Sequence, residues 1–293
     1  MANTVTYNKH DYVTKLRERL NRPLSWMDVM NVKYSDVRTI VQSLMSTEPS
    51  AQTVTRGTAY TYQDFTLTAD TLTISTGRDI PMFIDEADRY QQSYTDQMEI
   101  ADRQGKLLNE AIETLTLAEH ASWRNFGAGD LANTSADDTA QITVSATNID
   151  DIIRAVKRKI YANNGVDQAV ERGVFFVWRA ADFEILEGFV QASGFNEADI
   201  ALKNGIPVEK AFRYLGVNNY LSNSHTANHV FAGVRRSGNL GILRSTYGKV
   251  KFLENPATAD GELSGLGIYS RVDVGFAWVG APNNQLSIDL NVA

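Results

Sequence analysis

The sequence predicts an α+β protein, because three kinds of segment follow one another along the chain. Residues 52–84 are rich in Thr, Tyr, Phe and Ile and alternate polar with apolar side chains, which is typical of β-strands. Residues 85–123 contain no proline and carry apolar side chains at three- and four-residue steps, which indicates a helix. Beyond them, strand-like and helix-like segments alternate, as in a compact α/β unit.

Composition limits the class of protein. The 293 residues, 43% hydrophobic and 22% charged, suit one elaborated domain or two intertwined ones with a sizeable core. No apolar run of about 18 residues is present, and the first residues lack the pattern of a signal peptide, so we expect no membrane span and folding in the cytoplasm. The absence of cysteine excludes disulfides, thiolate catalysis and cysteine-ligated metal sites. The net charge of −7 argues against general nucleic-acid binding.

The first 47 residues contain two short amphipathic pieces, TKLRERL and SWMDVMNV, which we interpret as an arm with one or two helical segments. Their apolar side chains have no local element to cover them, so cover could come from the rest of the chain or from a neighbouring molecule. The residues concerned are Leu16, Leu20, Trp26, Met27, Val29 and Met30.

The strand-rich segment predicts a β-hairpin. A two-residue turn at 69–70 would pair Leu67 with Leu72, so that like side chains face each other across the two strands. Residues 80–84 are a candidate third strand. One face of the hairpin is rich in threonine and too polar for a deep core, so we expect the hairpin to project or to lie on a surface.

Residues 85–123 predict one long amphipathic helix, which would reach about 55 Å if unbroken. Asp85 is expected to cap its beginning. Gly105 lies inside the helix on the apolar stripe, where glycine costs about 1 kcal/mol relative to alanine. A bend or a close backbone contact is therefore expected at Gly105.

The remaining chain predicts alternating elements. Residues 149–160 carry isoleucine and valine on one helical face, and GVFFVW at 173–178 is typical of a buried strand that leads into a second amphipathic helix. The other predicted strands lie at 141–146, 212–223, 229–234, 249–253, 271–279 and 286–292, with a short helix or turn at 237–244.

No pattern indicates catalysis, and neither a cofactor nor a metal site is predicted. His225 and His229 are four residues apart, but the glutamate of HExxH is missing, and His10 and His120 are interpreted as isolated surface histidines. Paired carboxylates are interpreted as structural, since acidic residues are favoured in loops and in the first turn of a helix. These pairs are Asp137 with Asp138, Asp150 with Asp151 and Glu197 with Asp199.

The order of arm, hairpin, long helix, α/β block and returning strands resembles the major capsid protein of tailed bacteriophages, the Hong Kong 97-like fold. FTLTADTLTIS followed by FIDEADRYQQSYTDQMEIADRQGKLLNEAIETLTL looks like that family's extended loop running into its spine helix. VFFVWRAADFEILEGF looks like the strand that leads into a helix of its axial domain, and RYLGVNNYLSN like a later strand that ends in a Ser-Asn pair. SGLGIYSRVDVGFAWVGAPNNQLSIDLNV looks like the strands that return to its peripheral domain. The match covers most of the chain and rests on the order of elements.

The resemblance implies five regions: an N-terminal arm at 1–47, an extended loop with a β-hairpin at 48–84, a peripheral domain with the spine helix at 85–147, an α/β axial domain at 148–258 and return strands of the peripheral domain at 259–293. It implies a non-enzymatic subunit that assembles in the host cytoplasm into the hexamers and pentamers of a virion shell. Such a shell encloses double-stranded DNA without sequence-specific binding and without a membrane.

Partners are implied in the same way. If Met1 is the native start, the scaffolding protein is expected to be separate, because arm and hairpin already occupy the residues before the spine. A portal and, in some members of the family, a decoration protein are further implied partners. Residues 47–84 contain no lysine, so covalent crosslinking through a lysine of the extended loop is not expected.

The arm and the extended loop are predicted to lie between subunits, and Gly105 is the candidate hinge of the spine, where Gly105→Ala should straighten the helix and impair assembly. An encapsulin-like compartment shell is an alternative function, followed by an enzyme such as a carbohydrate hydrolase. The predicted contact residues are Leu16, Leu20, Trp26, Met30, Arg56, Tyr60, Tyr62, Phe65, Leu67, Leu72 and Ile74.

Overall fold

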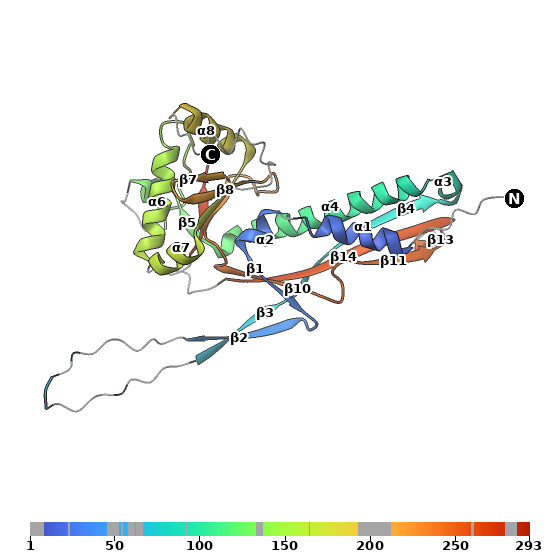
Figure 1. The fold of residues 1–293 in the computed structure, drawn as a ribbon, viewed down its shortest axis with the longest axis horizontal. Coiled ribbons are helices and arrows are strands. Elements are labelled where there is room, and N and C mark those ends of the chain that lie inside the picture. Colours follow the sequence, from blue (N-terminus) through green and yellow to red (C-terminus); the bar gives the residue numbers. More distant parts are fainter. Residues whose placement is uncertain are drawn as a thin grey trace.

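The computed structural model has an elongated lobe, a second lobe of helices around a sheet, which we call the α/β lobe, and a projecting β-hairpin (Figure 1). The elongated lobe carries the longest helix and the longest strand, and the α/β lobe lies at one of its ends. The structure describes residues 9–22, 24–45, 53, 55–57, 62, 67–91, 93–132, 137–163, 165–192, 212–258, 261–278 and 286–293.

The elongated lobe is built on a sheet whose central strand is β14 (Gly265–Trp278). One edge of β14 pairs antiparallel with β11 (Lys249–Glu254) and then with β10 (Gly238–Leu243), and the other edge pairs with β4 (Thr76–Asp85). β1 (Asn31–Ser35) adds to β10 in parallel. Two short strands pair with each other between β11 and β14, namely β12 (Ala257–Thr258) and β13 (Gly261–Glu262).

Helices cover this sheet. α1 (Lys9–Leu20) and α4 (Tyr94–Ala118) run alongside each other over the strands, and α2 (Ser25–Val29) lies near the α/β lobe (Figure 1). The buried residues of α4 include Ala101, Leu108 and Ile112, which belong to the predicted apolar stripe. Tyr94, at the same helical spacing but in the first turn of α4, is 55% exposed.

The predicted single helix over 85–123 is wrong at both ends. α3 (Glu86–Gln91) precedes α4, and η1 (Glu119–Ser122) follows it as a turn of 3-10 helix. Asp85 caps α3, because its Oδ1 accepts a hydrogen bond from the N–H of Ala87 at 2.9 Å. Ser93 begins α4 with a capping box: its hydroxyl accepts from the N–H of Asp96 at 3.2 Å, and the Asp96 carboxylate accepts from the N–H of Ser93 at 2.8 Å.

The capping box can be tested by Ser93→Ala. We expect this variant to lose about 1 kcal/mol of unfolding free energy, because the N–H of Asp96 loses its acceptor at the beginning of α4. Thr95→Ala, an exposed change in the same turn, is the control and should stay within about 0.5 kcal/mol of the wild type. Urea unfolding measures both. Equal stability of the two variants would show that the break before α4 does not depend on this cap.

The α/β lobe is built on a six-stranded sheet in the order β5-β15-β9-β6-β8-β7. Its helices lie against and around this sheet (Figure 1). The strands are β5 (Arg124–Phe126), β15 (Ser287–Asn291), β9 (His229–Val234), β6 (Val174–Trp178), β8 (Val217–Leu221) and β7 (Phe212–Tyr214). The helices are α5 (Ala128–Leu131), α6 (Ile149–Ala162), α7 (Val166–Arg172) and α8 (Ala180–Ala192).

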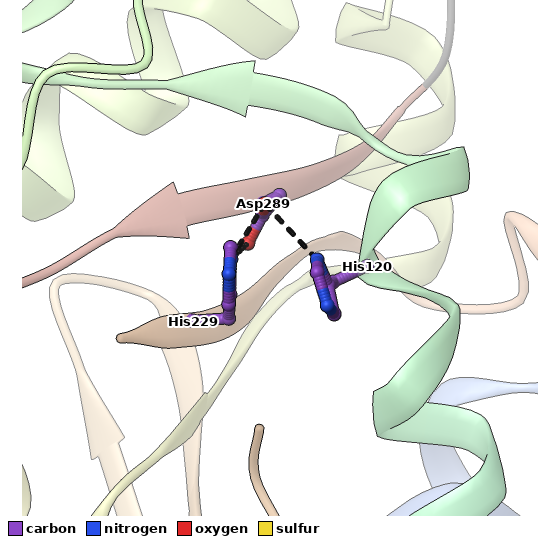
Figure 2. Close-up of side chains that lie close together, drawn as sticks. All are labelled: His120, His229 and Asp289. Atoms are coloured by element: carbon purple, nitrogen blue, oxygen red, sulfur yellow. Dashed lines mark hydrogen bonds and ion pairs between the residues drawn. The ribbon is translucent and has the colours of Figure 1, made fainter. Parts of the chain in front are cut away.

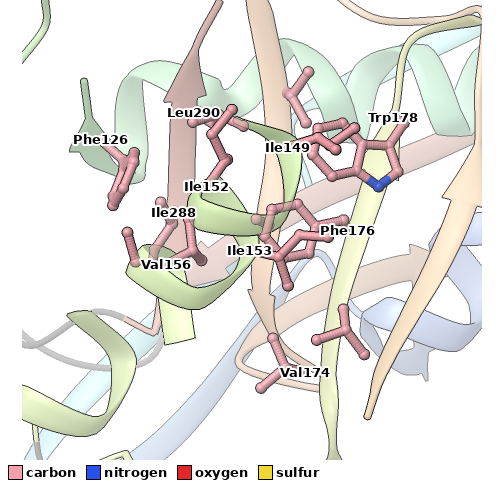
Figure 3. Packing of buried hydrophobic residues seen from close by; sticks show 14 of the residues in the cluster. Phe126, Ile149, Ile152, Ile153, Val156, Val174, Phe176, Trp178, Ile288 and Leu290 are labelled. Atoms are coloured by element: carbon pink, nitrogen blue, oxygen red, sulfur yellow. The ribbon is translucent and has the colours of Figure 1, made fainter. Parts of the chain in front are cut away.

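One face of the six-stranded sheet packs against α6, as predicted from the isoleucine spacing (Figure 3). The α6 side chains on that face are fully buried and contact β6 and β15, whose inward residues include Phe176, Trp178 and Ile288. The α6 residues are Ile149, Ile152, Ile153, Val156 and Ile160.

The opposite face of the same sheet belongs to a second core. Phe175, Val177 and Phe231 cluster with buried residues of α1, α4 and β14. Side chains alternate between the two faces of a strand, so β6, with all five residues buried, contributes to both cores. The two lobes are therefore joined by a hydrophobic core that they share.

The α+β class is confirmed, and so are the strands predicted near 174–178 and at 229–234. Residues 237–244, predicted as a helix or turn, form β10, and the strand predicted at 141–146 reduces to one isolated bridge between Ile142 and Val292. Sheet pairing also crosses the predicted boundary near 258. β10 and β11 join the elongated lobe, whereas β15 joins the α/β lobe.

Candidate functional site

The projecting hairpin is formed by β2 (Thr39–Met45) and β3 (Leu67–Thr73), which pair antiparallel over their whole length. The predicted turn at Ala69-Asp70 is wrong, because both residues lie in the middle of β3. The sequence of residues 67–72, LTADTL, reads almost the same in both directions from its centre at 69–70. This symmetry is compatible with a straight strand as well as with a hairpin. The third predicted strand exists within β4, but it pairs with β14.

The base of the hairpin crosses the sheet of the elongated lobe at two glycines, one on β10 and one on β14. A Cβ at Gly241 would lie 2.4 Å from Leu72 Cδ2, and a Cβ at Gly275 would lie 2.1 Å from the Thr73 carbonyl oxygen. Leu72 and Ile74 are buried there by their own chain. Away from the base, the hairpin exposes apolar side chains, since Val41 is 64% exposed.

The structure corrects the prediction for the arm. Leu16 and Leu20 are 0% exposed and Trp26 and Met30 are 1% exposed, so the chain itself supplies the cover that was assigned to neighbouring subunits. Of the other predicted contact residues, Leu72 and Ile74 are buried, Arg56 and Tyr62 are exposed, and Tyr60, Phe65 and the side chain of Leu67 lie outside the described residues.

Gly105 explains how the arm is covered. A Cβ at Gly105 would lie 2.7 Å from the Leu16 carbonyl oxygen and 3.0 Å from Arg19 Cβ, so α1 crosses α4 at a distance that only glycine permits. Of the two expectations for Gly105, the close backbone contact is confirmed. An added methyl group would push α1 away from α4 rather than simply straighten α4.

A row of buried polar side chains on α4 holds the arm beside this crossing. Gln104 accepts a hydrogen bond from the Tyr12 hydroxyl at 3.0 Å and donates one to the Ile80 carbonyl at 2.8 Å. Two and a half turns further along α4, Glu113 accepts a hydrogen bond from the Ser25 hydroxyl. Burial raises the pKa of Glu113, and its hydrogen bonds to Ser25 oppose that shift.

Asn109, between Gln104 and Glu113, makes the third contact of this row. It accepts a hydrogen bond from Trp26 Nε1 at 2.7 Å and donates one to the Arg22 carbonyl at 2.8 Å. Buried polar groups are costly unless paired, so these bonds fix the register of the arm along α4.

Gly105→Ala tests the crossing. We expect it to lower the unfolding free energy by about 1 to 3 kcal/mol, because backbone overpacking outweighs the gain in helix propensity. Gly188→Ala is the matched control: it lies within α8 with no atom within 4 Å of the added Cβ, and should gain up to about 1 kcal/mol. Thermal or urea unfolding measures both. A Gly105→Ala protein as stable as Gly188→Ala would contradict the close contact.

An apolar hollow of about 390 Å³ lies on the face of β4, β11 and β14. Phe83, Leu253 and Leu263 line it and are 43%, 46% and 41% exposed. Pro81 and Pro256 also line it. This hollow is a second place, besides the hairpin, where large apolar side chains remain uncovered in the subunit.

A cluster of two histidines and one aspartate lies where the lobes meet (Figure 2). The ring of His120, on η1, stacks on the ring of His229, on β9, with centroids 3.7 Å apart and planes 20° apart. His229 Nδ1 lies 2.9 Å from Asp289 Oδ2, and His120 Nδ1 lies 3.8 Å from the same oxygen. Burial raises the pKa of Asp289 to about 6, and lowers the pKa of His120.

The interpretation of His120 as isolated is therefore wrong. His229 and Phe231 share one face of β9, and the end of α4 places His120 and Trp123 over that face, where Trp123 stacks on Phe231 at 3.8 Å. Because successive side chains of a strand point to opposite faces, the sequence HVFAGV indicates that His229 and Phe231 lie on the same face of the sheet. No local sequence pattern indicates that η1 and β15 place His120 and Asp289 beside His229.

The HTANH pattern does not form a pair, because His225 lies apart from His229 against the end of β6. Backbone groups of Trp178 and Val177 hydrogen-bond the His225 ring, and Arg179 lies beside it. Burial, with a smaller contribution from Arg179, lowers the pKa of His225 to about 4.

His225 predicts a loss of stability in acid. Between about pH 6.5 and pH 4 the unfolded chain protonates this ring and the folded chain does not, so stability falls as the pH falls. From pH 7 to pH 4.5 this should cost about 2 kcal/mol. His225→Gln should lose correspondingly less over the same interval, measured by urea unfolding at both pH values. Equal losses of unfolding free energy in the wild type and in His225→Gln would contradict the lowered pKa of His225.

Three carboxylates of the pairs proposed as structural, Asp137, Asp138 and Asp150, have structural partners. Asp137 pairs with Arg124 and lies 3.0 Å from Lys159 Nζ, and Asp138 accepts from the N–H of Gly129 at 2.5 Å. Asp150 lies 2.6 Å from Arg154 on the exposed side of α6. Glu197 and Asp199 lie outside the described residues.

In the part of the chain that the structure describes, no helix is long and apolar enough to cross a membrane.

Comparison with known proteins identifies the fold. No protein-family model and no curated protein matches the sequence. The capsid of Ralstonia phage GP4 has a TM-score of 0.58 at 10% identity, covering 90% of this chain and 87% of that chain. The mature capsid of bacteriophage PhiM1 has a TM-score of 0.58 at 12% identity, covering 93% and 88%. A virus-like particle from Pyrococcus furiosus has a TM-score of 0.57 at 11% identity, covering 96% and 98%. The chain therefore has the fold of tailed-phage major capsid proteins, the Hong Kong 97-like fold that the sequence resembles.

Proposed function

We propose that the protein is the major capsid protein of a tailed bacteriophage and assembles into the icosahedral shell around its double-stranded DNA. The observation that carries this proposal is the match to phage capsid subunits over about nine-tenths of both chains. A match of this extent spans most of the chain, so it concerns more than one common structural unit.

The hairpin gives physical support. β2 and β3 pair with each other, and Val37, Val41 and Tyr62 on or near them are 63%, 64% and 94% exposed. Burial of apolar surface contributes about 25 cal/mol per Å², which the isolated subunit does not gain at these side chains. A neighbouring subunit would supply that burial.

The regions of the capsid fold can be assigned to the elements. We assign the N-terminal arm to residues before β2, the extended loop to β2, β3 and their connection, the spine helix to α4, the peripheral domain to the β14 sheet and the axial domain to the six-stranded sheet with α6 to α8. This assignment moves β10 and β11 to the peripheral domain and β15 to the axial domain, following the sheet pairing.

The remaining features of a shell subunit follow from this proposal. Copies form hexamers and pentamers of the virion, assembled in the host cytoplasm with a separate scaffolding protein and a portal, and with a decoration protein where the shell has one. The net charge of −7 suits a container that holds DNA without binding its phosphates tightly.

Val41→Asp tests the role of the hairpin. We expect particle yield to fall at least about tenfold, because a carboxylate at an apolar contact must be buried without a partner in each interface. Val41→Thr, which keeps the β-branched shape, is the matched control and should assemble. Negative-stain microscopy and size-exclusion chromatography measure the yield of shells.

The stability of the unassembled subunit separates assembly from folding. Val41 is exposed, so Val41→Asp should change its unfolding free energy by no more than about 0.5 kcal/mol. Normal shells from Val41→Asp would contradict a contact at this position. A wild-type chain that stays monomeric with and without a scaffolding partner would contradict the proposed function itself.

An encapsulin-like compartment shell is the second candidate, favoured by the match to the Pyrococcus furiosus particle over 98% of that chain. The contents of purified particles distinguish the two, because a compartment would hold a cargo protein and a phage capsid would hold DNA. The phage function is preferred because subunits of several phage capsids match over a similar span. A carbohydrate hydrolase is less supported, since Asp137, Asp138 and Asp150 are engaged in ion pairs or backbone hydrogen bonds.

A further inference from the structure

We propose that His120, His229 and Asp289 bind a divalent first-row transition metal such as Zn²⁺, which fastens the end of α4 to the six-stranded sheet. The inference does not depend on the proposed shell function. Among the described residues, these three bring one ligand atom each to within 4.8 Å of one another. Figure 2 shows both imidazoles beside the Asp289 carboxylate, each joined to it by a dashed line.

The spacing of the ligand atoms suits a tetrahedral ion. Two ligands about 2.1 Å from an ion at the tetrahedral angle lie about 3.4 Å apart. The Asp289 oxygen lies 2.9 Å from His229 Nδ1 and 3.8 Å from His120 Nδ1, so the two distances fall on either side of this value. Shifts of about half an ångström would bring both of these distances to the tetrahedral value.

The ligand types select the class of metal. Two imidazoles and one carboxylate suit Zn²⁺, Co²⁺ or Ni²⁺, whereas Ca²⁺ and Mg²⁺ prefer oxygen ligands alone. The side chain of Asp289 is 2% exposed, and those of His120 and His229 are each 24% exposed. The carboxylate is thus buried and its partners reach solvent, which gives an ion a path of entry and leaves a position for water.

Charge gives an independent reason. The ion pairs of Asp289 within the described residues are with these two histidines, which are positive only when protonated. A buried carboxylate is costly without a compensating charge. A divalent ion supplies that charge while both imidazoles stay neutral, which is their form as metal ligands.

Binding would separate the stacked rings. Imidazole nitrogens bind an ion in the plane of the ring, and the two rings lie nearly parallel at a centroid distance of 3.7 Å. Rotation about the Cβ–Cγ bonds of His120 and His229 would turn both Nδ1 atoms toward one point. Trp123, stacked on Phe231 at 3.8 Å, keeps η1 against β9 during this change.

The test uses the full chain after treatment with a chelator. Titration with Co²⁺ should give the intense visible absorption of a four- or five-coordinate ion, and Zn²⁺ should displace it. Zn²⁺ should also raise the Tm by at least about 3 °C, because ligands that bind only the folded state stabilise it. A weak six-coordinate spectrum with no shift in Tm would overturn the proposal.

Variants identify the ligands. His120→Ala and Asp289→Asn should each weaken Co²⁺ binding at least tenfold, whereas His10→Ala, which removes an exposed histidine of α1, should leave it unchanged. The Tm of each variant without metal shows whether it folds. His120 is partly exposed on η1, so His120→Ala keeps the test valid even if Asp289→Asn does not fold. The proposal would also be overturned if a folded His120→Ala protein bound Co²⁺ as tightly as the wild type, or if His10→Ala weakened Co²⁺ binding as much as His120→Ala.

Discussion

The crossing of α1 over α4 is the contact that places the rest of the elongated lobe. The Leu16 carbonyl oxygen lies so close to Gly105 that the two helices leave no room for a Cβ. Gln104, Asn109 and Glu113 then hold the arm at one register along α4, because an unpaired buried amide or carboxyl would be costly. The arm continues directly into β1 and β2. The seating of α1 therefore determines where β1 adds to the sheet and from which point the hairpin projects.

The six-stranded sheet of the α/β lobe packs against α1 and α4, so the position of these helices also sets the position of the α/β lobe. α6 packs on one of its faces, and α4 and β14 contribute to the core on the other face, so this sheet takes part both in the core of the α/β lobe and in the core that the two lobes share. Trp123 contacts both Phe231 and Trp278, and thus connects β9 with β14. A shared apolar core opposes independent movement of two lobes more than a polar interface does. The hairpin is held by a small cluster at its base, where Leu72 and Ile74 pack with Leu243, while Val41 on β2 stays 64% exposed.

The sequence predicts elements well where a local pattern decides them, and poorly where a distant partner does. Ile152 and Ile153 repeat at helical spacing and VFFVW is apolar on both faces, so α6 and β6 can be predicted without knowledge of the rest. β3 has a symmetrical pattern, and only its pairing with β2 shows that Ala69 and Asp70 are not a turn. β10 contains Gly238 and Gly241 and has weak strand propensity, but two neighbouring strands determine its structure. The histidine cluster joins three distant segments, and no local spacing could indicate it.

Uncovered apolar residues are a sound sign of assembly only after the subunit's own packing has been taken into account. Leu16 and Trp26 have no cover within the arm, but α4 lies against them in the folded chain, so they stabilise the subunit. Among the described residues, the apolar side chains that stay exposed include Val41 on the hairpin, Phe83 and Leu253 at the hollow, and Val170 on α7. The compared shells share this fold at sequence identities of only 10% to 12%. Many different sequences therefore specify this fold, because it depends on the pattern of buried apolar positions more than on particular side chains.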